Sequence, residues 1–188
     1  IDTLAIVNRK DSSIAREAKE VIYTKAGIEI AVATTKAYLA QVIVLLLIAI
    51  KGNDKEEEYL DSIRVLPNLI TKYINEYDYS SIAKVIENKE HVFYLGRGID
   101  YYLSMEGSLK LKEISYIHSE AFQAGELKHG SISLIDKDFG VIAVVTDKSI
   151  SDKTISNLKE VAARGAKIVD ITNIADDNFS DYKILVDD

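Results

Sequence analysis

The sequence predicts an α/β protein in which a parallel sheet is flanked by helices on both faces. Three runs of β-branched and almost uniformly apolar residues support this prediction, at positions 91–96, 140–147 and 167–172. Such runs are typical of strands that are buried on both faces of a parallel sheet. Helical patterns separate the runs, and right-handed crossovers of this length place helices on both sides of the sheet. A further strand is expected at residues 181–188.

Length and composition narrow the class of protein. The 188 residues, of which 47% are hydrophobic and 28% charged, suit one medium domain or two closely packed lobes. A formal net charge of −7 argues against nucleic-acid and anionic-membrane partners, because either needs a basic surface. The chain has no cysteine, which excludes disulfides, thiolate zinc sites and a cysteine nucleophile, and fits a reducing cytoplasm.

The N-terminal part begins with a short apolar run at residues 3–8, which we expect to be a strand. Residues 11–13 are good N-caps and predict a helix after them. Residues 37–50 are apolar throughout but shorter than the roughly 20 residues of a membrane-spanning helix, so they predict a buried helix. The chain starts with isoleucine and has no signal peptide, and we therefore expect a fragment of a longer protein.

The most charged stretch, "GNDKEEEY" at residues 52–59, suggests a boundary between two lobes. We predict an incomplete first lobe at residues 1–52 and a second lobe at residues 53–188. The alternative is a solvated helix face, because the acidic run continues into residues 59–74, which have helical spacing.

The turn after the run at 91–96 contains two glycines, Gly96 and Gly98, and precedes a helical pattern. Ligands of open α/β sheets bind beyond the carboxyl ends of the strands. Glycines allow a tight turn there, and the free amides of the next helix can bind an anion. The alternative is a turn that only packs. The chain lacks the GxGxxG and GxxxxGK[ST] motifs, so no nucleotide cofactor is predicted.

The helix after this turn has a lysine within its apolar face. Helical spacing places four apolar or small residues on that face, namely Leu103, Gly107, Leu111 and Ile114. Lys110 falls in the middle of the face, with Glu106 and Glu113 within side-chain reach. One interpretation is an ion pair that ties the helix to its neighbour. The other is a lysine and a carboxylate in a cleft, where burial and charge tune them for proton transfer.

Two longer segments resemble a known family. Residues 95–136, "LGRGIDYYLSMEGSLKLKEISYIHSEAFQAGELKHGSISLID", resemble the signature of the sugar isomerase (SIS) domain in the isomerase half of the glucosamine-6-phosphate synthase family. Residues 26–38, "AGIEIAVATTKAY", resemble the end of the first SIS lobe in the same family, and the spacing between the segments fits. The resemblance implies the three-layer SIS fold.

The resemblance also implies roles for individual residues. Glu113 matches the base that moves a proton between C1 and C2 of the sugar. Lys110 matches the lysine that contacts the substrate and the developing oxyanion. His129 matches a histidine that helps to open the sugar ring and reaches the active site of the neighbouring subunit. Val32 matches a residue whose backbone borders the sugar, and Thr34 stands where the family has serine.

The remaining histidines and acidic residues near this motif receive smaller roles. We interpret His118, Glu120 and Glu126 as structural or supporting residues and His91 as an ordinary surface or packed histidine. The histidines lack carboxylates at ligand spacing, so no metal site is predicted.

The activity that the resemblance implies is the conversion of fructose 6-phosphate and ammonia to glucosamine 6-phosphate, without a cofactor. It also implies a homodimer and, in the full-length chain, a glutaminase domain that supplies ammonia. The phosphate-binding loop of the first lobe would precede residue 1 and a lysine-bearing tail would follow residue 188, so we expect the fragment alone to be weak or inactive. Two alternatives are a related SIS enzyme, such as a fructosamine-6-phosphate deglycase or amino-sugar-phosphate isomerase, and a non-catalytic sensor of sugar phosphates.

Overall fold

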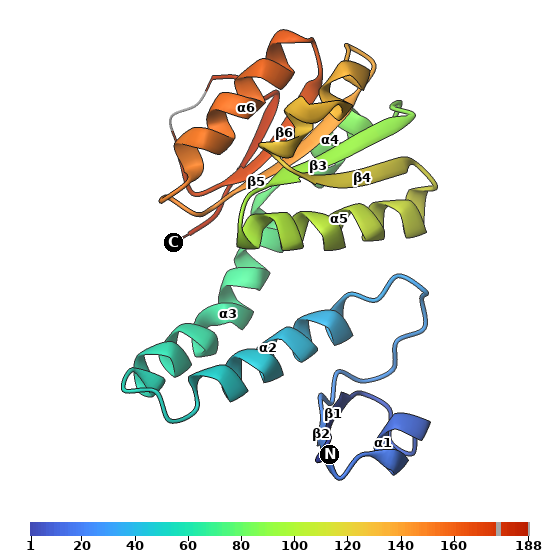
Figure 1. Ribbon diagram of the computed structural model, residues 1–188, viewed down its shortest axis with the longest axis vertical. Helices are drawn as coiled ribbons and strands as arrows, with labels where there is room; N and C mark the ends of the chain where they lie inside the picture. The colour runs from blue at the N-terminus through green and yellow to red at the C-terminus, as the bar shows by residue number, and fades with distance from the viewer. Residues whose placement is uncertain (176–177, 188) are drawn as a thin grey trace. The chain divides into compact units, whose positions relative to one another are not determined.

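The computed structural model describes residues 1–175 and 178–187 and divides into two compact units, Ile1–Glu76 and Tyr77–Asp188 (Figure 1). The boundary between these units lies at Glu76, because the charged stretch leads into helix α3 (Glu56–Glu76) of the first unit, and the lobe boundary at residue 52 stays a prediction. Acidic residues stabilise the start of a helix, and α3 has three of them in its first turn. The helical alternative for this stretch is confirmed, whereas the identification of the units with two SIS lobes stays a prediction.

The first unit begins with two short strands that pair in parallel, β1 (Leu4–Val7) and β2 (Glu20–Tyr23). Between them lies α1 (Ser13–Glu17), whose N-cap Ser12 accepts a hydrogen bond from the Ala15 amide, as the N-cap pattern predicts. The sequence did not indicate β2, because its residues form too short a run to show a strand period. Helices α2 (Lys36–Ile50) and α3 complete the unit.

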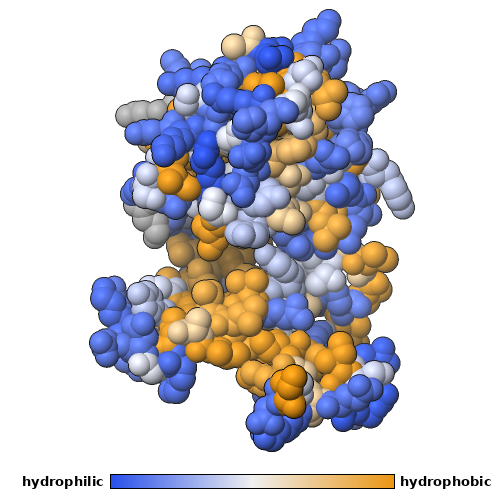
Figure 2. All heavy atoms as spheres, viewed as in Figure 1, coloured by the Kyte–Doolittle hydropathy of each residue, from blue (hydrophilic) through white to orange (hydrophobic). Residues whose placement is uncertain are grey.

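Helix α2 is confirmed as a helix, but the prediction that it is buried is wrong. None of its residues is buried, and Leu45 is 55% exposed. The helix is apolar on all sides, and a unit with only two short strands lacks the surface to cover it. Figure 2 shows the resulting hydrophobic residues at the surface of the first unit. No helix within the described ranges is both long and apolar enough to span a membrane.

The second unit contains one five-stranded sheet in the order β4-β3-β5-β6-β7, and every neighbouring pair is parallel. Its strands are β3 (His91–Gly96), β4 (His118–Gln123), β5 (Gly140–Val145), β6 (Lys167–Thr172) and β7 (Tyr182–Leu185). The four strands that the sequence predicts here are confirmed. Strand β4 was missed, because it lies at the edge of the sheet and its sequence, HSEAFQ, is mostly polar.

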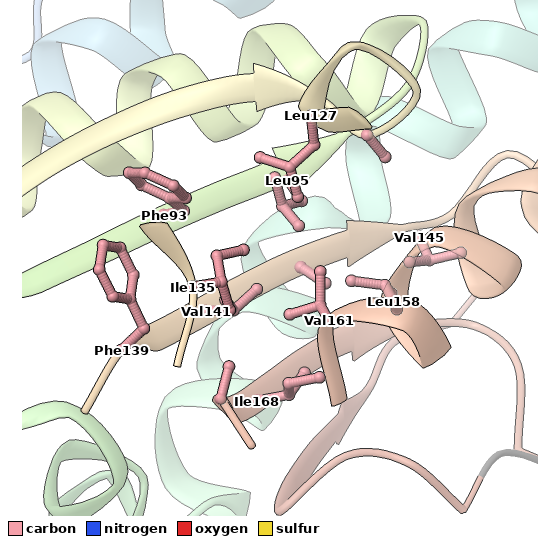
Figure 3. Close-up of a cluster of buried hydrophobic side chains, with 13 residues drawn as sticks. Phe93, Leu95, Leu127, Ile135, Phe139, Val141, Val145, Leu158, Val161 and Ile168 are labelled. Carbon is pink, nitrogen blue, oxygen red and sulfur yellow. The ribbon is translucent and has the colours of Figure 1, made fainter. Parts of the chain in front are cut away.

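Helices cover both faces of this sheet and give the expected three layers. They are α4 (Tyr79–Ile86), α5 (Ile99–Ser115) and α6 (Ser151–Ala163), with two 3₁₀ turns, η1 (Glu126–His129) and η2 (Ser131–Leu134), after β4. On one face, α6 packs Leu158 and Val161 against β3 and β5, as Figure 3 shows. On the other face, apolar residues of α4 and α5 surround Val92 and Tyr94. Successive residues of β3 therefore point into two different cores.

Tyr94 offers a test of the second core. Its side chain is only 9% exposed, and burial raises the pKa of its phenol to about 12. Because the neutral form is favoured only in the folded state, the associated stability is complete below pH 10 and is lost as the pH rises toward 12. Tyr94→Phe should therefore weaken the loss of unfolding free energy above pH 10, measured by urea titration. If the unfolding free energy of this variant depends on pH as that of the wild type does, Tyr94 does not have the raised pKa.

Candidate functional site

Helix α5 carries the two residues that the resemblance makes central. Gly98 is the N-cap of the helix, and Tyr116 is its C-cap, in the left-handed conformation with φ +62°. The helix runs back along the sheet, so its last turns lie beside the first residues of β3 and β4, where His91 pairs with His118. The long side chains of its last two turns are good helix formers.

Lys110 and Glu113 form a direct ion pair in these last turns. Lys110 Nζ donates to Glu113 Oε2 at 2.7 Å and lies 3.5 Å from Glu106 Oε1. The side chains are half-buried, with 20% of Lys110 and 24% of each glutamate exposed. The hydrogen bond to Glu113 raises the pKa of Lys110. The predicted reach of Lys110 to both glutamates is confirmed, and the ammonium group stays charged at neutral pH beside a carboxylate.

The predicted apolar face of α5 is confirmed in part, because Leu111 packs against the second core and Gly107 lies against Tyr94, but its two end residues are exposed. Leu103 and Ile114 are 46% and 65% exposed, while the buried residues of the helix are Asp100, Ser104 and Ser108. The apolar pattern does not report the buried serines, because serine is polar and can be buried only where its hydroxyl is hydrogen-bonded, as both are here. Ser104 Oγ donates to the Asp100 carbonyl at 2.8 Å, and Ser108 Oγ lies 2.9 Å from Ser119 Oγ on β4. Lys110 therefore lies at the border of the packed face.

Gly96 and Gly98 lie at the opposite end of α5 from this ion pair. Ile99 and Lys110 are separated by about 16 Å along the helix axis at 1.5 Å per residue. The backbone explains why both positions are glycine. A Cβ at Gly96 would lie 2.5 Å from the Asp100 carbonyl carbon, and Gly98 has φ +56°, a conformation that favours glycine. The structure thus does not bring them to Lys110 and Glu113, and their contact with a substrate stays a prediction.

Val32 and Thr34 belong to the first unit, in the segment between β2 and α2. Val32 is 86% exposed and Thr34 is partly buried. Glu29 shapes this segment, because its Oε1 accepts a hydrogen bond from the Thr35 amide at 2.8 Å. The role of Val32 and Thr34 stays a prediction.

His129 ends η1, after the carboxyl end of β4, and its side chain is exposed. Leu127 of the same turn is buried in the core and holds the turn on the sheet. Among the residues that the structure describes, His129 forms no hydrogen bond with Lys110 or Glu113. Within one chain the ion pair and the histidine thus belong to opposite ends of the strands.

The other two histidines form a pair that the sequence did not indicate. His91 Nδ1 and His118 Nδ1 lie 3.1 Å apart across the first register position of β3 and β4. His91 also stacks on Phe139. Glu120 is 3.7 Å from His118, so these residues support the edge of the sheet. Within the described parts of the chain, no group of three or more histidine, aspartate or glutamate residues could hold a metal ion.

Arg97 lies between the two glycines, and its side-chain contacts were not predicted from the sequence. Its guanidinium reaches across to α6 and donates to Asn157 Oδ1 at 3.0 Å. It lines a cleft of about 440 Å³ together with Gly125 and Lys128. The only available signal was an arginine in the turn after a buried strand, at the end of the sheet where ligands commonly bind.

The fold and this arrangement define a sugar-isomerase type of α/β domain, and the comparisons agree. The family model described as SIS domain matches residues 1–51 and 85–186, and the chain belongs to this family. The chain is 49% identical over 176 residues to the isomerizing glutamine–fructose-6-phosphate aminotransferase of Fusobacterium nucleatum, covering 89% of this chain and 29% of that protein. The aminotransferase of the same name from Methanosarcina mazei is 42% identical over 195 residues, covering 98% and 31%.

A solved structure shows the same relationship. The C-terminal domain of glucosamine-fructose-6-phosphate aminotransferase from Francisella tularensis superposes with a TM-score of 0.89 at 36% identity, covering 100% of this chain and 56% of that one. A phosphosugar isomerase structure from Silicibacter pomeroyi, at 23% identity and a TM-score of 0.80, shares the fold. The chain spans less than a third of the length of the curated relatives described above.

Proposed function

We propose that the chain is the sugar-phosphate isomerase part of an enzyme that makes glucosamine 6-phosphate from fructose 6-phosphate and ammonia. The observation that carries this proposal is the half-buried pair of Lys110 and Glu113, joined at 2.7 Å. SIS family membership and the names of the relatives support it. A glutaminase domain elsewhere in the full-length protein would supply the ammonia.

The chemistry needs a base and a nearby cation. Ammonia replaces the C2 carbonyl oxygen of the open-chain ketose and releases water, which gives an imine. Glu113 then removes a proton from C1 and returns it to C2, while the imine nitrogen gains a proton and the O1 hydroxyl loses one, so that a 2-amino aldose forms. Negative charge develops on O1 as the hydroxyl proton leaves, and the Lys110 ammonium stabilises it. No metal or organic cofactor takes part in the proposed steps.

His129 would open the sugar ring by acid–base transfer at the ring oxygen, for which an imidazole is suited near neutral pH. Its place at the carboxyl end of the strands, away from Lys110 and Glu113, favours a function in the site of a second subunit. We therefore propose a homodimer in which each chain contributes His129 to its neighbour. Val32 and Thr34 would border the sugar from the first unit.

A proton-exchange experiment tests the function. The chain, and separately the full-length product of its gene, are incubated with glucosamine 6-phosphate in heavy water. The C2 proton resonance should disappear from the NMR spectrum as deuterium enters, because the reverse reaction removes that proton. Heat-denatured protein is the control. Binding of the sugar to the full-length product without any exchange would refute isomerase activity and favour a sensor.

A further inference from the structure

The segment that carries His129 is held by polar contacts to α6. Arg97 Nη2 donates to Asn157 Oδ1 at 3.0 Å, and the Asn157 side chain is buried. Lys128, the neighbour of His129, forms an ion pair with Glu160 at 2.6 Å. Asn157 and Glu160 are three residues apart in α6 and so lie on one face of that helix. Lys128 of η1 and Arg97 of the turn after β3 thereby contact the same face of α6.

Gly125, which begins η1, explains why the guanidinium fits there. A Cβ on Gly125 would lie 2.4 Å from Arg97 Nη2 and 3.0 Å from Arg97 Cζ. The planar group therefore lies directly against the backbone of residue 125, and any larger residue would displace it. Gly125 has φ −70°, so the glycine is explained by the space that the guanidinium occupies and not by backbone conformation.

Hydrogen bonds hold both the backbone next to Arg97 and its side chain. It follows β3, and the Gly96 carbonyl accepts a hydrogen bond from the Ala124 amide at 2.9 Å. This bond joins the turn after β3 to the residue before Gly125. The guanidinium then extends from this junction to α6, so it connects three parts of the fold at the start of η1. An arginine suits this task because its planar fork has several donors in fixed geometry.

We propose that Arg97 is a positioning residue for His129, acting through Gly125 and Asn157. The inference rests on the proposed function, since ring opening is what gives His129 a task. The guanidinium lies against the residue where η1 begins, and the Lys128–Glu160 ion pair, with both side chains partly exposed, adds a weaker contact near its end. A histidine that transfers a proton to a ring oxygen needs placement within a fraction of an ångström, so a loosened turn should slow ring opening and spare the later proton transfer.

The test compares two substrates with the full-length gene product and added ammonium. Fructose 6-phosphate must be opened, whereas 5-deoxyfructose 6-phosphate lacks the hydroxyl that closes the ring and is always open. Arg97→Met should lower kcat for fructose 6-phosphate by about 10- to 100-fold. It should change turnover of the 5-deoxy substrate much less. Gly125→Ala, which displaces the guanidinium but keeps Arg97, should show the same selectivity, and Arg64→Met on α3 is the matched control.

A second measurement does not depend on activity. Amide hydrogen exchange across residues 124–130 should become faster in Arg97→Met and Gly125→Ala and stay unchanged in Arg64→Met. Equal losses on both substrates, or unchanged amide exchange in this segment, would overturn the inference while leaving the isomerase proposal intact. A wild-type protein that turns over neither substrate would instead overturn the proposed function.

Discussion

Glu113→Gln is expected to lower the rate of deuterium exchange at C2 of glucosamine 6-phosphate by about 10³-fold, within the range found for loss of a general base. The amide has nearly the shape of the carboxylate and keeps an oxygen that can accept the Lys110 hydrogen bond, which is 2.7 Å long in the wild type. The helix should therefore stay folded and the substrate should still bind. The loss should appear in kcat and not in KM, because the base acts on the reacting carbon.

The control for this variant is Glu87→Gln. Glu87 is the exposed C-cap of α4, so the substitution makes the same change of charge on a different helix. Exchange is followed by NMR with the full-length product at saturating sugar. A Glu113→Gln protein that exchanges within threefold of the wild type would remove Glu113 as the base and leave another group, such as Glu106, to be sought.

The parts of the fold that could be predicted are those whose sequence reports burial directly. Strands β3, β5 and β6 are buried on both faces over most of their length, so most of their residues are apolar and the runs are recognisable. Strand β4 escaped prediction because one of its edges is unpaired and only Ser119 of its residues is fully buried. For α5, the fully buried residues are an aspartate and two serines, which an apolar pattern does not report, and the partners of Asp100 lie 46 and 47 residues away in the sequence.

The contacts of the candidate site also differ in whether the sequence predicts them. Lys110 and Glu113 are one helical turn apart, so their contact follows from helix geometry alone. The contact of Arg97 with Gly125 and Asn157 depends on how β3, β4 and α6 come together, and no local pattern reports it. Spacing within one element is readable from sequence, whereas contacts between elements require the fold.

Asp100→Ala should produce the largest loss of stability, about 3 to 4 kcal/mol of unfolding free energy in the second unit. The carboxylate is only 3% exposed and accepts three hydrogen bonds, from the Thr146 amide at 2.8 Å, Thr146 Oγ1 at 2.6 Å and the Asp147 amide at 3.3 Å. Alanine would leave these partly buried donors without this partner, and each such group costs about 1 to 3 kcal/mol when water does not replace the lost bond. The measurement is urea unfolding followed by circular dichroism.

Asp152→Ala is the matched control, because Asp152 lies in the first turn of α6 as Asp100 lies in the first turn of α5. Both variants lose a favourable interaction with a helix N-terminus, but only Asp100 is buried and bonded to the loop after β5. The difference between the two therefore isolates the hydrogen bonds. Equal destabilisation would mean that the helix terminus, and not the link between α5 and the β5–α6 loop, holds this end of α5. A loss specific to Asp100 would show that this link anchors the helix that carries Lys110 and Glu113.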